Sequence, residues 1–419
     1  MFFLNFTQIA EEEVDKVSVI VSGEPSEELL DSLSLNSDSI SEVVVPSCKV
    51  SSPLPMKFLQ VGDLKGGALL NALVKEASSD YLLFVKPTVS FEEEFIEELL
   101  EEFEGTDVDA VFPNLILRSG EGEEVKNYQQ VYNKEISLVA SLSLEDWIPD
   151  QVILFKREVL EKGELFDSKL ADYELYDFLY RNLRWLKLKL AEFSYATYSL
   201  KDAFIDTAWR SFVLREKVLK KYDWKKELFP FLSWEEKPEV AEATALTIIG
   251  KRLAAYFDYF NASSYLRRAL LKFHNQESLR ELVGVLVNMG FFKEAKELLS
   301  PLQGMEKSDI KERKERIEKI ESLIKELEKA VEEGKLEEVL AVASEVAGVY
   351  QGAPLHNLLG FIYWIGGKKE EAYRFFYKAV TMNPLDRDYL HNLTLSAKEL
   401  GKGQEVERLV KILISEFTT

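Results

Sequence analysis

A lysine stands directly after a buried-looking strand in the first half of the chain. Residues 81–85 read Tyr-Leu-Leu-Phe-Val, and Lys86, Pro87 and Thr88 follow them. A cation at the end of a strand could neutralise a bound diphosphate directly, without a metal ion. The alternative interpretation is that Lys86 is a solvated residue that binds nothing.

A second cationic segment comes before a helical pattern. Lys65 and Gly66 open an amphipathic stretch that runs to about Ala77. Free backbone N–H groups at the N-terminus of a helix attract phosphate, so Lys65 and Gly66 join Lys86 as candidate substrate-binding residues. The alternative is that this segment is a plain turn.

Carboxylates form the third candidate group. Glu145, Asp146 and Asp150 flank Trp147 in a predicted loop and supply further carboxylates. The chain holds 73 Asp and Glu residues, so these positions do not define a site without further support.

Strands alternate with helices in the elements that must position these residues. The pattern predicts strands at residues 17–21, 40–45, 57–61, 81–85 and around 110–117. It predicts helices that begin at a Ser26 cap and after Lys65, and a third over residues 91–103. This alternation predicts βαβ units and a largely parallel sheet, with ligands beyond the carboxyl ends of the strands.

The order of these segments resembles family 2 glycosyltransferases, which have a GT-A fold. Residues 17–21 and 40–45 resemble the first two strands of that family, and residues 65–71 resemble the start of its "small-x-Arg-Asn" helix. Residues 166–167, followed by residues 171–175, resemble its "Phe-Asp … Glu-Asp-x-Glu-Leu" segment, which is the most specific match. The resemblance extends to about residue 210.

The resemblance implies transfer of a sugar from a nucleotide sugar to an acceptor hydroxyl or thiol. The acceptor must lose a proton to a base, and Asp172 matches the catalytic base of the family. An alternative role for Asp172 is to cap the helix predicted over residues 173–183.

Three positions on the donor side depart from the family pattern. The family has a nucleotide-binding Asp after the second strand, where this chain has Pro46 and Ser47. Its metal-holding Asp-x-Asp is replaced by Lys86-Pro87-Thr88, and residues 193–199 contain no histidine. These departures imply that any remaining activity uses no metal and no cofactor, and that the donor is a nucleotide sugar. Ser47 is a further substrate-binding candidate. Complete loss of activity, as in a pseudoenzyme, is the alternative.

The second half of the chain contains a repeat. Residues 353–386 resemble a tetratricopeptide repeat (TPR), whose signature positions are Leu359, Gly360, Tyr363, Ala372, Phe376, Ala379 and Pro384. The turn at Gly367 recurs at Gly290, Gly334 and Gly401, which predicts about five units. Residues 307–329 are predicted to lengthen one helix, with a flexible charged linker as the alternative. Such arrays form a superhelix whose concave groove binds a protein or peptide, and a homodimer interface is the alternative use.

Composition limits the class of protein. A net charge of −21 argues against nucleic acid and anionic membranes as partners. The single cysteine excludes an internal disulfide and a multi-cysteine zinc site. No apolar run is long enough for a membrane span, and the first residues do not resemble a secretory signal. The expectation is a cytoplasmic protein, and the Glu/Lys-rich composition fits a thermophile.

The sequence therefore predicts an α/β region followed by an all-α region. We expect a GT-A-like domain over residues 1–205, a helical connector over residues 206–240 and a TPR-type helical solenoid over residues 241–419. Two functions are consistent with this arrangement. One is a metal-independent glycosyltransferase that modifies a polypeptide recruited by the repeats, and the other is an inactive relative that acts as a protein-binding scaffold.

Overall fold

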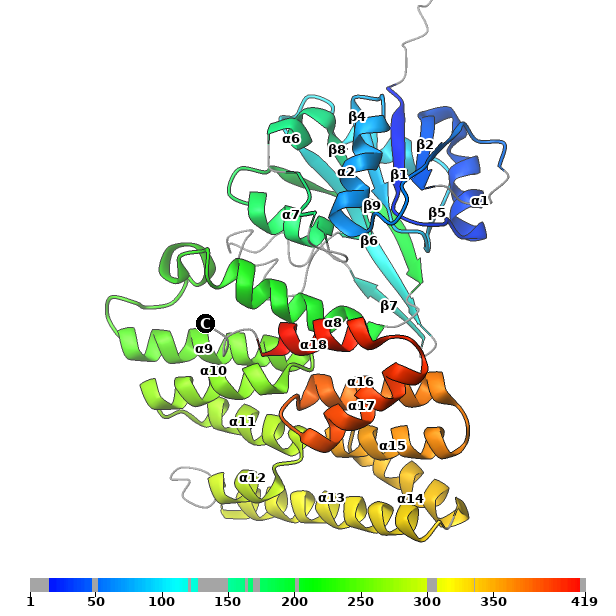
Figure 1. Cartoon of the computed structure of the whole chain (residues 1–419). Helices are drawn as coiled ribbons and strands as arrows, with labels where there is room; N and C mark the ends of the chain where they lie inside the picture. The colour runs from blue at the N-terminus through cyan, green and yellow to red at the C-terminus, as the bar shows by residue number, and fades with distance from the viewer. Residues whose placement is uncertain are drawn as a thin grey trace, which may run out of the picture. The chain divides into compact units, whose positions relative to one another are not determined.

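The computed structural model describes most of the chain in two compact units (Figure 1). The described residues are 15–46, 52–119, 122–126, 150–162, 165–168, 174–199, 203–299, 307–334 and 336–414. The described residues from 15 to 199 belong to the first unit, and those from 203 to 414 belong to the second. Each unit is described by itself.

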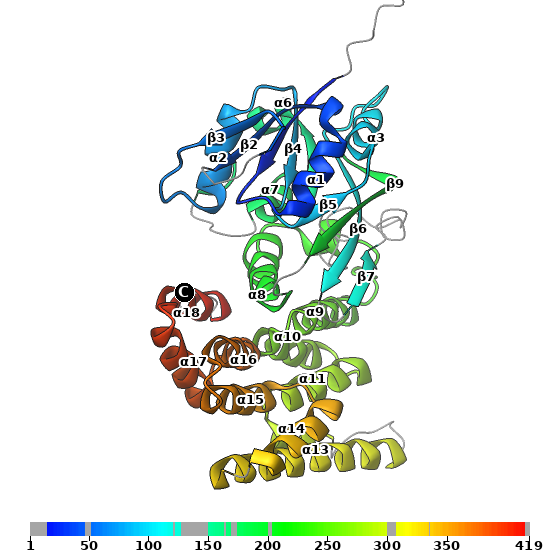
Figure 2. The same cartoon turned by 90° about the vertical axis from the view of Figure 1, so that its right-hand side faces the viewer.

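The first unit is built on one sheet (Figure 2). Among the described residues the sheet has nine strands in the order β3-β2-β1-β4-β8-β6-β9-β5, and β7 pairs with β6. The strands are β1 Val17–Val21, β2 Ile40–Pro46, β3 Met56–Leu59, β4 Tyr81–Val85, β5 Val89–Phe91, β6 Ala110–Ser119, β7 Gly122–Lys126, β8 Val152–Lys156 and β9 Leu188–Ser199.

The sheet is mixed, so the prediction of a largely parallel sheet is wrong beyond β4. Strands β3, β2, β1 and β4 pair in parallel, as the alternating pattern predicted. Strand β8 then pairs antiparallel with β4 and with β6, while β6 and β9 pair in parallel. Residues 152–155 are all buried apolar side chains. A strand buried on both faces has no alternation of polar and apolar residues, and its sequence does not encode its direction.

Helices α1 Glu27–Leu35, α2 Gly66–Glu76, α3 Phe95–Glu101, α6 Arg157–Lys162 and α7 Glu174–Asn182 accompany the sheet. The predicted cap of α1 is confirmed, because Ser26 Oγ accepts a hydrogen bond of 3.2 Å from the Leu29 N–H. The third predicted helix is shorter than expected. Phe91 instead ends β5, which pairs with β9, and the helix starts only after Glu94, whose φ is 66°.

The second unit is helical. It begins with α8 Ala203–Val213 and two π-helical turns, Leu214–Val218 and Trp224–Leu228. Five consecutive helix pairs follow within the described residues: α9 Pro238–Ala255 with α10 Tyr259–Lys272, α11 Gln276–Met289 with α12 Phe292–Leu298, α13 Lys307–Glu333 with α14 Leu336–Val349, α15 Ala353–Ile365 with α16 Lys369–Met382, and α17 Arg387–Glu399 with α18 Gly403–Leu413. No helix in the described part of the chain is both long and apolar enough to span a membrane.

The predicted inter-helix turns are confirmed. Gly290, Gly334, Gly367 and Gly401 each follow the first helix of a pair, and their φ angles are 92°, 68°, 76° and 71°. This left-handed backbone conformation favours glycine because it carries no Cβ. Helix α13 is continuous over 27 residues, so the flexible-linker alternative is wrong.

The helix pairs do not form an open superhelix. In an open solenoid each repeat contacts only its neighbours, but here α18 packs against α8 and α16 packs against α10 (Figure 1). Arg215 Nη2 donates a hydrogen bond of 2.6 Å to the Ile412 carbonyl, and Asn261 Nδ2 donates one of 3.0 Å to the Leu413 carbonyl. These contacts attach the last helix to the start of the unit, and the expected long concave groove is therefore interrupted.

Candidate functional site

The carboxyl ends of β1 and β4 meet at a small cavity in the first unit. Its volume is about 30 Å³, which accommodates a water molecule rather than a nucleotide. The residues that line it are Ile20, Ser22, Leu70, Phe84, Val85, Lys86, Asp150, Glu174 and Leu175. They come from β1, α2, β4, the residues before β8 and the start of α7, so the cavity lies where the sequence predicted a ligand site.

Lys86 forms an ion pair at this strand end. Its Nζ lies 2.9 Å from Asp150 Oδ2, and the Asp150 side chain is 0% exposed while that of Lys86 is 24% exposed. The Lys86 Nζ also lies 5.5 Å from the centre of the Tyr198 ring, within range of a cation–π contact. The cation is therefore held by groups of the protein itself.

The register of the sheet brings these two residues together. Strands β4 and β8 are antiparallel, and Val85 is the partner of Val152. The pairing continues one step further, because the Lys86 N–H donates to the Gln151 carbonyl at 2.9 Å. The residue after β4 therefore lies beside the residues that precede β8, and the side chains of Lys86 and Asp150 can pair there.

The described residues at this strand end do not fit a divalent metal ion. The ammonium of Lys86 lines the cavity and would repel a divalent cation bound there. The carboxylate of Asp150 is already engaged by that ammonium. No cluster of three or more His, Cys, Asp or Glu side chains suited to a metal occurs in the part of the chain that the structure describes.

The two residues after Lys86 also have structural contacts. The Pro87 carbonyl accepts a hydrogen bond of 2.9 Å from the Ser26 N–H, and a Cβ added at Gly23 would lie 3.0 Å from Pro87 Cγ. Thr88 Oγ1 donates to the Ser199 carbonyl at 2.9 Å. Residues 86–88 are thus packed against the turn after β1, the α1 cap and β9.

The start of α2 docks on a distant segment. Asn71 Nδ2 donates to the Phe166 carbonyl at 2.8 Å, and the Phe166 N–H donates to Asn71 Oδ1 at 3.1 Å. A Cβ at Gly67 would lie only 2.2 Å from the Asp167 carbonyl oxygen, so only glycine fits this close approach. Two segments that the sequence analysis identified separately are therefore in direct contact.

The predicted phosphate-binding residues are not brought to the cavity. Lys65 is exposed at the N-cap of α2, and its side chain makes no capping hydrogen bond. Gly66 is buried with a φ of 54°. Neither residue lines the cavity around Lys86, where α2 contributes Leu70 instead.

Several candidate residues lie outside the described part of the chain. These are Ser47, Asp172, Glu145, Asp146 and Trp147. Their roles stay predictions. Asp150 was among the carboxylates noted in the sequence, but its pairing with Lys86 was not foreseen, because the two residues are 64 positions apart.

Comparison with known proteins gives structural neighbours at low similarity. No family model matches the chain, and no curated protein matches it. Residues 1–349 of S. aureus TarS match at 17% identity, covering 64% of this chain and 90% of that one, with a TM-score of 0.40. The same protein in complex with UDP-GlcNAc matches at 16% identity with a TM-score of 0.40, covering 64% of this chain and 90% of that one. The mannosyltransferase PcManGT from Pyrobaculum calidifontis, in complex with GDP-Man and Mn2+, matches at 15% identity, covering 67% of this chain and 82% of that one, with a TM-score of 0.41.

Proposed function

We propose that this protein is a glycosyltransferase-like binding protein. Its GT-A-like sheet domain has lost sugar transfer, and its TPR-type helix pairs bind a partner polypeptide. The observation that carries the proposal is the Lys86–Asp150 ion pair at the end of β4. A cation that is paired with a buried carboxylate contributes little net positive charge to a diphosphate.

The energetics of the pair support this interpretation. Separating Lys86 from Asp150 to bind a diphosphate would leave the fully buried carboxylate without its partner. Breaking a buried ion pair from one side costs about 3–5 kcal/mol. Binding a donor at Lys86 would therefore have to offset this cost, which favours a structural role for the pair.

The helix pairs support polypeptide binding. Gly360 lies close to Phe376, where an added Cβ would be 2.4 Å from the ring, and Ala372 is fully buried. These are the small and aromatic positions that let the two helices of a tetratricopeptide repeat approach each other closely. Proteins built from such repeats bind peptides on their helical faces.

A metal-independent glycosyltransferase is the second candidate. The observation that favours it is that Lys86 is partly exposed and lines the cavity beside Ser22. In that reaction the acceptor would give its proton to Asp172, and its oxygen or sulfur would bond to the anomeric carbon. The bond from that carbon to the diphosphate would break, and the nucleoside diphosphate would leave with the electron pair, stabilised by Lys86.

Calorimetric titration with a panel of nucleotide sugars, with and without Mn²⁺ or Mg²⁺, separates the two candidates. The proposal predicts no binding by the full chain under either condition. Metal-free binding that Lys86→Ala abolishes, and that the control variant Lys162→Ala retains, would establish the second candidate instead. Lys162 is a suitable control because it belongs to the same unit and pairs with Glu158 on the surface.

A further inference from the structure

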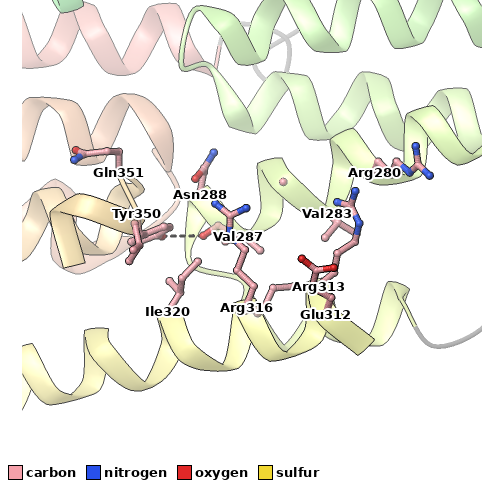
Figure 3. A pocket seen from close by; sticks show the side chains of 13 residues that line it. Arg280, Val283, Val287, Asn288, Glu312, Arg313, Arg316, Ile320, Tyr350 and Gln351 are labelled. Atoms are coloured by element: carbon pink, nitrogen blue, oxygen red, sulfur yellow. Dashed lines mark hydrogen bonds between the residues drawn. The ribbon is translucent and has the colours of Figure 1, made fainter. Parts of the chain in front are cut away.

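The second unit contains a pocket much larger than the cavity at the strand ends. It lies between α11, α13 and the segment 349–351, and its volume is about 570 Å³ (Figure 3). Ligand pockets in proteins commonly have volumes of about 300–1,000 Å³. Its floor is apolar and buried, with Val283 and Val287 from α11 facing Ile317 and Ile320 from α13.

Three arginines surround this floor. Arg280 belongs to α11, and Arg313 and Arg316 extend from α13 toward α11 (Figure 3). All three are exposed. Within the described ranges none of them forms an ion pair, although elsewhere arginines pair with carboxylates, as Arg267 does with Glu294 at 2.6 Å. Among the described residues that line the pocket Glu312 is the one acidic side chain, so cations predominate among them although the chain has a net charge of −21.

The pocket is kept open by two features of its walls. Tyr350 Oη donates a hydrogen bond of 2.8 Å to the Val287 carbonyl and so attaches the segment 349–351 to α11 (Figure 3). Gly284 lies in the middle of α11, and a Cβ built there would meet no atom within 4 Å. Glycine in a helix interior costs about 1 kcal/mol relative to alanine, and here it leaves the wall without a side chain.

We infer that this arginine pocket binds a segment of a partner polypeptide that carries acidic side chains beside an apolar one. The inference rests on the proposed function, that the helix pairs bind a polypeptide, and it adds the chemistry of that partner. Carboxylates accept paired hydrogen bonds from the planar guanidinium group. An apolar side chain would cover the buried Val287 and Ile320.

Nucleic acid is the less favoured anionic partner. Binding a phosphate backbone requires a broad basic surface. The net charge of −21 repels such a polymer over most of the chain, whereas a short acidic segment needs only the three arginines.

Selection of a phage-displayed random peptide library on the full chain tests the inference. Enriched peptides should have an excess of Asp and Glu next to an apolar residue. The variant Arg280→Glu/Arg313→Glu/Arg316→Glu should enrich none of them. A control with the same change in charge, Lys293→Glu/Lys311→Glu/Lys319→Glu, replaces exposed lysines that do not line the pocket and should retain binding.

Affinity measurements on an enriched peptide refine the test. Each single Arg→Ala variant should weaken binding by about tenfold or more, as expected for an arginine that anchors an interface. Gly284→Leu should also weaken binding, because its side chain would project into the pocket without any change in charge. Unchanged helical circular dichroism for each variant would show that the unit has folded.

The alternative outcomes are distinct. Enriched peptides without an acidic excess, or peptides that still bind the triple Arg→Glu variant, would overturn the inference and leave the proposed function standing. Enrichment of no peptide would contradict both. Binding of inorganic pyrophosphate at the three arginines without any peptide enrichment would assign the pocket to a phosphorylated small molecule and would likewise overturn the inference.

Discussion

Protonation of His356 should destabilise the helical unit at mildly acidic pH. His356 lies in α15, is 6% exposed and stacks on Phe375 at a ring distance of 5.9 Å. Burial, together with the nearby charge of Lys378, lowers its pKa from 6.5 to about 4, although a backbone hydrogen bond with Gln351 opposes the shift. The folded state therefore holds this imidazole neutral at a pH where the unfolded chain would protonate it.

The sign and size of the effect follow from this difference. Between pH 6.5 and about 4 the unfolded state binds more protons at this histidine than the folded state does, so stability falls as the pH falls. One pKa unit corresponds to about 1.4 kcal/mol. The lowering of the His356 pKa from 6.5 to about 4 therefore corresponds to a loss of about 3 kcal/mol in the free energy of unfolding. This loss is complete below pH 4 and absent above pH 6.5.

Urea unfolding followed by circular dichroism between pH 7.5 and 4 measures this loss. Many carboxylates also titrate in this range, so the informative quantity is the difference between wild type and His356→Leu. That variant should lose about 3 kcal/mol less than wild type over the range, whereas His391→Gln, which changes an exposed histidine of α17, should behave as wild type. Equal losses for wild type and His356→Leu would refute the reasoning.

Three further substitutions test packing. Arg215→Leu leaves the buried Asp258 carboxylate without its cation and should lower the free energy of unfolding by about 3–5 kcal/mol in urea titrations. A loss below about 1 kcal/mol would show that the Arg215–Asp258 pair does not hold the helical unit closed. Gly67→Ala places a Cβ against the Asp167 carbonyl and should lower the melting temperature through a cost of about 1–3 kcal/mol. The Cβ added by Gly284→Ala would contact no atom, so this variant should raise stability by about 1 kcal/mol, measured in the same thermal scans. If both glycine variants changed the melting temperature in the same direction, the assigned contacts would be contradicted.

The sequence predicted those features that depend on local pattern. The cap at Ser26 and the turn glycines were found because their chemistry acts within a few residues. The continuous helix α13 was found because its apolar residues repeat at helical spacing. These elements can be predicted without knowledge of what they pack against.

Features that depend on contacts distant in sequence were not predicted. Strand β8 is apolar on both faces, so its sequence contains no signal for whether it runs parallel or antiparallel to β4. The Lys86–Asp150 pair depends on that direction, because only the antiparallel register places the two residues side by side. The closure of the helical unit depends on Arg215 reaching the Ile412 carbonyl, 197 positions away. No local pattern in the sequence marks either contact.

A double-mutant cycle on Lys86 and Asp150 tests the central claim most directly. If the pair is structural, Lys86→Met alone should lower the free energy of unfolding by about 3–5 kcal/mol, because it strands a fully buried carboxylate. The double variant Lys86→Met/Asp150→Leu should recover most of that loss, since both charges are then gone. The account would be contradicted if Lys86→Met changed the free energy of unfolding only slightly, or if the changes caused by the two single substitutions added up in the double variant. Either result would show that Lys86 is available for a ligand.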